Sequence, residues 1–167
     1  MRTLLIYLTI LSFIFTMDTV NNIDIPRFMG KWYVISTIPN FVERGCENAY
    51  DIYTLNPDGT IDVLYSAIKG GEEFTVQQNG EIIDKVNNST WKMRFTKPYI
   101  PFYRAPYEVI ILDDEYDYMV VGYPDNEYGW IMSRANHMDE KIYQEIVNIL
   151  EVDFDYEKES FKKVLHQ

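Results

Sequence analysis

The chain has little of several residue types that would point to particular functions. Cys46 is the one cysteine among 167 residues, so no disulfide can form within the chain even in an oxidising compartment. The two histidines, His137 and His166, lie far from Cys46 in the sequence, which favours a structural thiol over a nucleophile. Lysine and arginine number 15 against 26 acidic residues. Because phosphate binding depends on clustered basic side chains, no nucleic-acid partner is expected.

The chain also lacks an apolar run of clear membrane-spanning length at its start. Arg2 is followed by an apolar segment from Leu4 to Phe15, which is typical of a secretory signal and shorter than the ~20 residues of a membrane span. We expect cleavage between Thr16 and Val20, although no small-x-small triplet marks the site. The prediction is a signal peptide over residues 1–19 and a single domain over residues 20–167. The protein would then be secreted without a stable membrane anchor; the alternative is that the segment itself is an anchor.

Short β-rich segments separated by turn residues are abundant. Turn chemistry is clear at Asn56-Pro57-Asp58-Gly59, Gly70-Gly71 and Pro124-Asp125-Asn126. Eight consecutive strands with mostly short connections predict an antiparallel up-and-down meander. The expected strands are Lys31–Ile38, Glu47–Leu55, Ile61–Ile68, Glu73–Ile83, Thr90–Thr96, Tyr107–Leu112, Tyr118–Gly122 and Tyr128–Ser133.

A helix is predicted after these strands. Apolar residues recur at helical spacing from about Asp139 to Leu150, with Asp139 as the N-cap. This apolar face should pack against the outside of the barrel, and Phe161–Leu165 should add a short final strand. The residues expected on the apolar face are Ile142, Ile146, Ile149 and Leu150.

Two aromatic segments lie at opposite ends of the strand-rich region. Gly30-Lys31-Trp32-Tyr33 begins the first expected strand, and Trp130-Ile131-Met132-Ser133-Arg134 ends the last one. In a closed barrel such strands are neighbours, so the Arg134 guanidinium can stack on the Trp32 indole. We interpret this pair as a structural closure of one barrel end rather than as a ligand contact.

The order and spacing of these motifs resemble the lipocalins, in particular the bacterial lipocalin and apolipoprotein D group, from about Ile25 to the C-terminus. The resemblance implies an all-β fold: an eight-stranded antiparallel up-and-down barrel with a C-terminal α-helix, binding small lipophilic molecules inside. Bacterial members commonly carry a lipidated cysteine at the signal cleavage site, and this chain has none there. Further matching stretches are Phe41–Asn48, Leu55–Thr60, Phe95–Tyr99, Tyr107–Ile110, Leu112–Tyr116 and Tyr128–Arg134.

Strand direction predicts which loops surround the cavity. If Trp32 starts the first strand at the closed end, the links Pro39–Gly45, Lys69–Glu72, Lys97–Pro106 and Pro124–Glu127 lie at the open end. The links Asn56–Thr60, Asp84–Ser89 and Asp113–Asp117 then lie at the closed end. The longest links are at the mouth, where loops on a rigid scaffold tend to determine binding specificity.

Alternation along the strands, phased from Trp32 and the family pattern, predicts the cavity wall. The set is aromatic and apolar with a few polar tips, as expected for a site that buries an acyl chain or ring. One alternative is that the side chains fill the barrel completely; another is that a one-residue slip turns Asp51 outward. The predicted wall residues are Val34, Ser36, Asp51, Val63, Tyr65, Phe74, Trp91, Met93, Tyr107, Val109 and Trp130.

Three classes of function follow from this interpretation. The first is a secreted carrier of fatty acids, lysophospholipids or similar amphiphiles. Lys97 and Arg104, helped by Arg44, are predicted to hold an anionic headgroup at the mouth, unless they are solvated loop charges. The second is an interaction module that binds another protein, such as an immune component, through its mouth loops. The third, an enzyme, is least expected, because Asp51 and tyrosines are the only candidates inside the barrel, and no cofactor or metal site is predicted.

Overall fold

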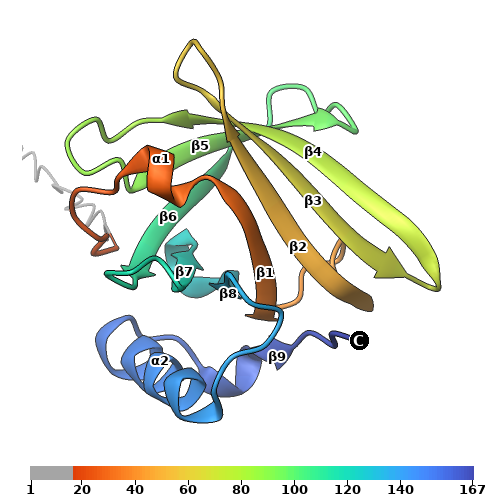
Figure 1. Cartoon of the computed structure of the whole chain (residues 1–167), viewed down its shortest axis with the longest axis vertical. Helices are drawn as coiled ribbons and strands as arrows, with labels where there is room; N and C mark the ends of the chain where they lie inside the picture. Colours follow the sequence, from red (N-terminus) through yellow and green to blue (C-terminus); the bar gives the residue numbers. More distant parts are fainter. Residues whose placement is uncertain (1–16) are drawn as a thin grey trace, which may run out of the picture.

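The strands form one antiparallel sheet that closes into a barrel in the computed structural model, which describes residues 17–167 (Figure 1). Each strand pairs with the next along the chain, and β1 pairs with both β8 and β2, which completes the closure. The predicted fold class is confirmed, with every strand within two residues of its expected bounds. The barrel strands are β1 (Gly30–Thr37), β2 (Cys46–Leu55), β3 (Ile61–Lys69), β4 (Glu72–Ile82), β5 (Thr90–Lys97), β6 (Ala105–Leu112), β7 (Tyr118–Gly122) and β8 (Gly129–Ser133).

The predicted signal peptide, residues 1–19, lies almost entirely outside the described residues. The end of the expected cleavage window lies within them and contacts the barrel. The Val20 amide donates to the Val109 carbonyl at 3.0 Å, and the Thr19 hydroxyl accepts from Ser89 at 2.9 Å. Within residues 17–167, no helix is long and apolar enough to cross a bilayer.

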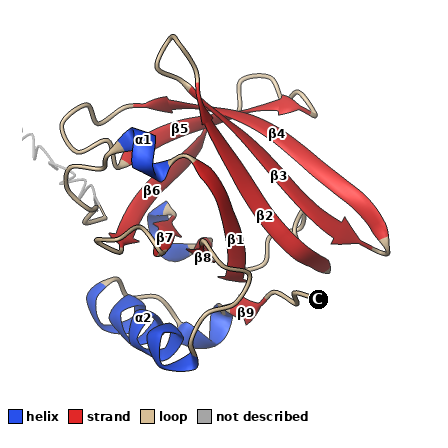
Figure 2. Cartoon of the chain, in the orientation of Figure 1, coloured by secondary structure: helices blue, strands red, loops and turns tan. Residues whose placement is uncertain are grey.

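Helix α2 (Glu140–Asp153) lies outside the barrel, where Figure 2 shows it beside β7 and β8. Asp139 is its N-cap as predicted and accepts from the Lys141 and Ile142 amides. The predicted face is partly wrong. Tyr143 and Val147 are buried, whereas Ile149 is 40% exposed, because the buried positions follow the spacing i, i+3, i+4 and i+7 from Tyr143. These side chains cover Ile35, Ile110, Val120 and Ile131 on the outer face of the barrel.

The final strand is shorter than expected. β9 (Lys162–Lys163) pairs with the end of β1. The rest of the predicted strand, Phe161–Leu165, does not continue this pairing, and single backbone hydrogen bonds hold Val164 and Leu165. The Val164 amide donates to the Ile35 carbonyl, and the Leu165 carbonyl accepts from Asn48. The C-terminal segment therefore runs along β1 after α2 and joins the sheet at its edge.

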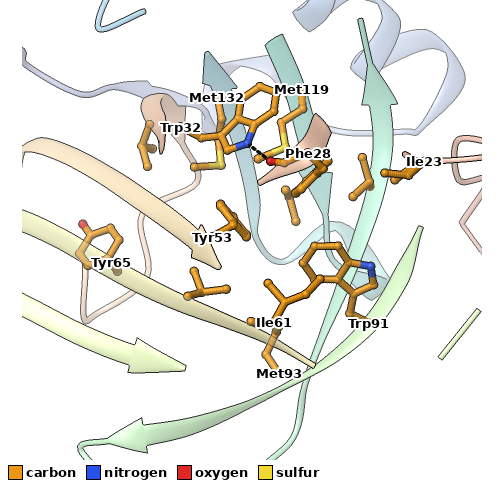
Figure 3. Close-up of a cluster of buried hydrophobic side chains, with 14 of the residues drawn as sticks. Ile23, Phe28, Trp32, Tyr53, Ile61, Tyr65, Trp91, Met93, Met119 and Met132 are labelled. Carbon is orange, nitrogen blue, oxygen red and sulfur yellow. Dashed lines mark hydrogen bonds between the residues drawn. The ribbon is translucent and has the colours of Figure 1, made fainter. Parts of the chain in front are cut away.

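A short helix, α1 (Ile25–Phe28), closes one end of the barrel. Its Phe28 side chain is fully buried and packs against Trp32, with ring centroids 5.5 Å apart. The Trp32 indole donates to the Phe28 carbonyl at 2.8 Å (Figure 3). The Arg134 guanidinium lies 3.7 Å from the Trp32 ring centroid and also donates to the Tyr116 carbonyl in the β6–β7 turn. The predicted closure and the predicted placement of that turn are both confirmed.

Candidate functional site

The barrel encloses a cavity of about 380 Å³ above its packed closed end. Inward residues of β2 to β8 form its wall, and loops at the open end form its rim. Most of the lining side chains are apolar or aromatic. They are Asn40, Phe41, Val42, Glu43, Asp51, Tyr53, Val63, Tyr65, Val76, Gln78, Met93, Phe95, Ile100, Tyr103, Ala105, Pro106, Tyr107, Val121, Tyr123, Tyr128, Trp130 and Met132.

The floor of the cavity is an aromatic stack. Trp91 is fully buried, and its ring stacks on Tyr107 at a centroid distance of 4.8 Å. Phe28 approaches Trp91 edge-on from the closed end at 5.3 Å, and Tyr53 lies beside both (Figure 3). These rings fill the lower part of the barrel, so the cavity occupies only the upper part.

The structure divides the eleven predicted wall residues into four groups. Val34, Trp91 and Val109 point inward but belong to the packed floor, because Phe28 and the neighbouring rings leave no space beside them. Phe74 packs against Tyr65 with centroids 6.3 Å apart and does not line the cavity. Ser36 lies on the other face of the sheet. The residues that do line the cavity are Asp51, Val63, Tyr65, Met93, Tyr107 and Trp130.

The inward placement of Ser36 is wrong because β1 contains a bulge. Val34 pairs with Met132 and Ser36 pairs with Ile131, so Ile35 has no opposite residue on β8. One extra residue exchanges the two faces of a strand. Ser36 therefore faces α2, with its hydroxyl 3.1 Å from that of Tyr143, and Thr37 takes the inward position opposite Trp130.

Glu43 lies in a loop, outside the strands from which the wall was predicted. It is one of two carboxyl groups that line the cavity among residues 17–167. Asn40 accepts from the Val42 and Glu43 amides, which turns the β1–β2 loop back over the mouth. The Trp130 indole donates to both Glu43 carboxylate oxygens at 3.0 Å, and the Asn40 amide donates to one at 2.8 Å. Burial raises the pKa of Glu43 to about 7. An asparagine three residues before a glutamate in a mouth loop is the sequence signal for this turn.

Asp51 is the second carboxyl group, and it faces inward as predicted. Tyr53 donates to its Oδ2 at 3.3 Å, and the Tyr53 and Tyr107 hydroxyls are 2.8 Å apart. Burial, and then the charge of Glu43, raise the pKa of Asp51 to about 8. The pKa values of Tyr53 and Tyr107 also lie well above the usual range because of burial. The deep part of the cavity is therefore a hydrogen-bonded acid–phenol cluster.

The predicted basic residues are at the open end but outside the cavity. Arg44, Lys97 and Arg104 are exposed and do not line it. Among the described residues, no lysine, arginine or histidine side chain lines this cavity. Whether these three residues contact a ligand headgroup at the mouth stays a prediction.

Other candidate chemistry is sparse in residues 17–167. No group of three or more His, Cys, Asp or Glu side chains there could hold a metal ion. The Cys46 thiol is partly buried, 3.9 Å from the Val42 carbonyl. His166 lies outside the cavity, with Nε2 2.9 Å from the Val34 carbonyl.

Sequence comparison connects this architecture with known proteins. A family model described as a lipocalin-like domain matches residues 23–166. Temperature-induced lipocalin-1 of Arabidopsis thaliana is 32% identical over 136 residues, covering 78% of this chain and 73% of that protein. Outer membrane lipoprotein Blc of Escherichia coli K12 is 32% identical over 132 residues, covering 78% and 72%. Apolipoprotein D of Macaca fascicularis is 29% identical over 136 residues, covering 77% and 70%.

Comparison of structures shows the same fold at lower identity. Insecticyanin from the tobacco hornworm Manduca sexta superposes with a TM-score of 0.68 and 18% identity, covering 89% of this chain and 84% of that one. The cockroach allergen Per a 4 gives a TM-score of 0.66 and 20% identity, covering 91% and 94%.

Proposed function

We propose, since this chain belongs to the lipocalin family, that it binds and carries a small lipophilic or amphiphilic ligand of the fatty-acid or lysophospholipid kind. The family is known for binding small hydrophobic molecules. The observation that carries the proposal is the cavity of about 380 Å³ with its mainly apolar and aromatic lining. Binding sites for small ligands typically measure ~300–1,000 Å³, with a few polar groups that fix orientation.

We also propose that residues 1–19 are removed on export and that residues 20–167 act outside the cell or in the cell envelope. The apolar segment from Leu4 to Phe15 supports export. The names of two relatives, an outer membrane lipoprotein and an apolipoprotein, are compatible with such a location. Mass spectrometry of the N-terminus of protein collected from the medium or periplasm tests this proposal. An N-terminus at Met1 would contradict it.

The proposal is carriage rather than catalysis. Relatives in this family are binding and transport proteins. Within the described cavity, the neighbours of Asp51 are tyrosines and Glu43, and all of these groups hold their protons to raised pKa values. A nucleophile activated by an adjacent base needs the opposite arrangement, with a lowered pKa.

Displacement of an environment-sensitive lipophilic probe tests the carriage proposal. The wild-type protein, delipidated first, should bind the probe saturably and release it to a fatty acid or lysophospholipid. Ala105→Trp, which adds a ring at the cavity wall, should abolish binding, whereas Val152→Trp on the exposed side of α2 should not. Both variants are checked by thermal unfolding. Absence of saturable binding by any amphiphile would reject the proposal.

A second function, recognition of another protein through the mouth loops, has one specific observation in its favour. Phe41, Tyr99 and Phe102 are strongly exposed around the open end. Exposed apolar patches on soluble proteins often mark interaction sites. Replacing Phe41 and Phe102 by serine should weaken capture of such a partner and leave probe binding intact. Unchanged capture would remove support for this function.

A further inference from the structure

The cavity contains two carboxyl groups and no basic side chain among the residues that the structure describes. Glu43 reaches in from the mouth loop and Asp51 from β2. Burying an ionised carboxylate without a charge partner is costly. Among the described residues, no basic side chain in the cavity balances this acidic pair, so a cationic ligand would supply the counter-charge.

The carboxyl groups have unused acceptor capacity toward the cavity. Tyr53 donates to Oδ2 of Asp51, and no residue from 17 to 167 donates to Oδ1. Asp51 is partly exposed and lines the cavity. Glu43 Oε1 accepts from the Trp130 indole, and the Thr37 hydroxyl also lies close to this carboxyl group. A carboxylate oxygen can accept more than one donor. A ligand group that donates hydrogen bonds would satisfy the remaining acceptor capacity of both carboxyl groups.

The polarity of the cavity changes from its floor to its rim. Asp51, Tyr53 and Tyr107 lie deep, next to the Trp91 floor. The side chains at the rim include Phe41, Ile100 and Tyr103, which are apolar or aromatic. An amphiphile with a polar head near Asp51 would keep its tail against the apolar wall and rim. This arrangement favours entry head first.

We propose that this cavity selects a cationic amphiphile, an alkyl amine whose ammonium group lies between Asp51 and Glu43 and donates to Oδ1 of Asp51. The proposal rests on the proposed function, because it requires that the cavity binds amphiphiles. Ammonium supplies up to three donors and the missing positive charge, and hydrogen bonds between charged groups are stronger than neutral ones. A fatty acid bound in the same direction would instead place a third acidic group beside two others.

The titratable groups around this subsite give the binding a specific pH dependence. Asp51 faces Glu43, Tyr53 and Tyr107, and Glu43 also acts on Tyr65, which neighbours Cys46. The pKa is about 7 for Glu43 and about 8 for Asp51. A nearby ammonium favours the ionised carboxylates, so binding should release protons between about pH 6 and 8. The alkyl amine itself stays protonated there, since such amines titrate near ~10.

The test compares lauryl amine, lauryl alcohol and lauric acid by calorimetry below their micellar concentrations. At about pH 8, wild-type protein should bind the amine at least about tenfold more tightly than the alcohol, and the acid most weakly. The advantage of the amine should shrink at about pH 6. The heat of amine binding should depend on the ionisation enthalpy of the buffer, which reports the released protons.

Single substitutions test which residues determine the preference for the amine. Asp51→Asn and Glu43→Gln should each remove most of the preference for amine over alcohol and raise the affinity for lauric acid. Glu47→Gln, an exposed acid at the start of the same strand, makes the same change in net charge and should leave all three affinities unchanged. If Asp51→Asn fails to fold, the Glu43→Gln variant and the pH dependence of wild-type binding test the inference instead.

The outcomes separate this inference from the proposed function. Equal binding of amine and alcohol by wild-type protein at about pH 8, without proton release, overturns the inference and leaves carriage standing. The same conclusion follows if the amine preference persists in both carboxyl variants. No saturable binding of any of the three amphiphiles overturns both. Lauryltrimethylammonium, which cannot donate a hydrogen bond, should bind more weakly than the amine; equal binding would contradict the predicted bond to Asp51.

Discussion

The guanidinium of Arg134 lies 3.7 Å from the centre of the Trp32 ring and joins the last barrel strand to the first. The same side chain donates to the Arg27, Phe28 and Met29 carbonyls around the end of α1. Gly30 adopts a φ of +97°, and a Cβ there would lie 3.4 Å from Arg134 Nη1. The glycine thus combines a left-handed backbone with close approach of the guanidinium. This contact lies below the packed floor, away from the cavity.

Arg134→Ala should therefore lower stability without changing binding. The loss of the cation–π contact and the carbonyl hydrogen bonds should cost about 1 to 3 kcal/mol in the free energy of unfolding. Chemical denaturation measures the loss, and Lys92→Ala, an exposed residue on β5, is the control. An unchanged stability with a large loss of probe affinity would show that the pair belongs to the ligand site.

The fold could be predicted from the sequence because its signals are local and repeated. The turn residues from Asn56 to Gly59 end one strand and start the next, and Trp91 and Met93 alternate with the exposed Lys92 and Arg94 on β5. The closure between Trp32 and Arg134 followed from the meander, because the first and last strands of a closed barrel are neighbours.

The site could be predicted only in part because two of its determinants are not periodic. The bulge at Ile35 leaves no mark in the alternation of β1, yet it moves Ser36 outside and Thr37 inside. Glu43 comes from a loop, where strand parity gives no direction. The depth of the cavity was also hidden, since Phe28 enters from α1 and fills the space beside Val34 and Val109.

The revised position of Ser36 predicts a double-mutant cycle with Tyr143. Tyr143→Phe should destabilise the protein by about 1 kcal/mol, because it leaves the buried Ser36 hydroxyl without its 3.1 Å partner. Adding Ser36→Ala should cost less than the sum of the two single changes. Ligand affinity should stay constant throughout, since this bond lies outside the barrel. Additive effects, or a loss of affinity in Ser36→Ala, would favour the original inward placement.

The raised pKa values of Glu43 and Asp51 predict how stability depends on pH. Both groups bind their proton more tightly in the folded protein than in the unfolded chain, where ordinary values are 4.5 and 3.8. Their contribution to stability is complete below about pH 4 and is lost as the pH rises through the folded values of about 7 and 8. For each proton that the folded protein binds and the unfolded chain does not, the free energy of unfolding falls by about 1.4 kcal/mol per pH unit.

Asp51→Asn should therefore flatten this dependence in the empty protein. Unfolding free energies between about pH 5 and 8 should fall less steeply than in wild type, so the variant gains relative stability toward alkaline pH. Glu47→Gln should follow the wild-type curve. Parallel curves for wild type and Asp51→Asn would mean that Asp51 is solvated and ionised in the folded protein.

The tryptophans should report ligand binding unequally. Trp130 lines the cavity, whereas Trp91 and Trp32 are fully buried below it. A saturating amphiphile should shift or quench the emission of wild-type protein, and Trp130→Phe should remove most of that change. Trp91→Ala should mainly destabilise the protein, by about 3 to 5 kcal/mol, because it empties the floor. If the ligand changes the emission of Trp130→Phe as much as that of wild-type protein, the ligand lies beside Trp91 or Trp32, below the cavity.

The exposed basic residues at the mouth remain a separate proposal for anionic ligands. A fatty acid that enters tail first would leave its carboxylate near Lys97, the last residue of β5, and Arg104 in the loop before β6, away from Asp51. Exposed charges contribute little individually, so the double variant Lys97→Ala, Arg104→Ala is needed. Its preference for a fatty acid over the matched methyl ester should fall by about two- to fivefold, as should that of wild-type protein in high salt. Amine affinity should not change, since that headgroup lies at Asp51. Equal acid selectivity in the two proteins would show that Lys97 and Arg104 serve solubility alone.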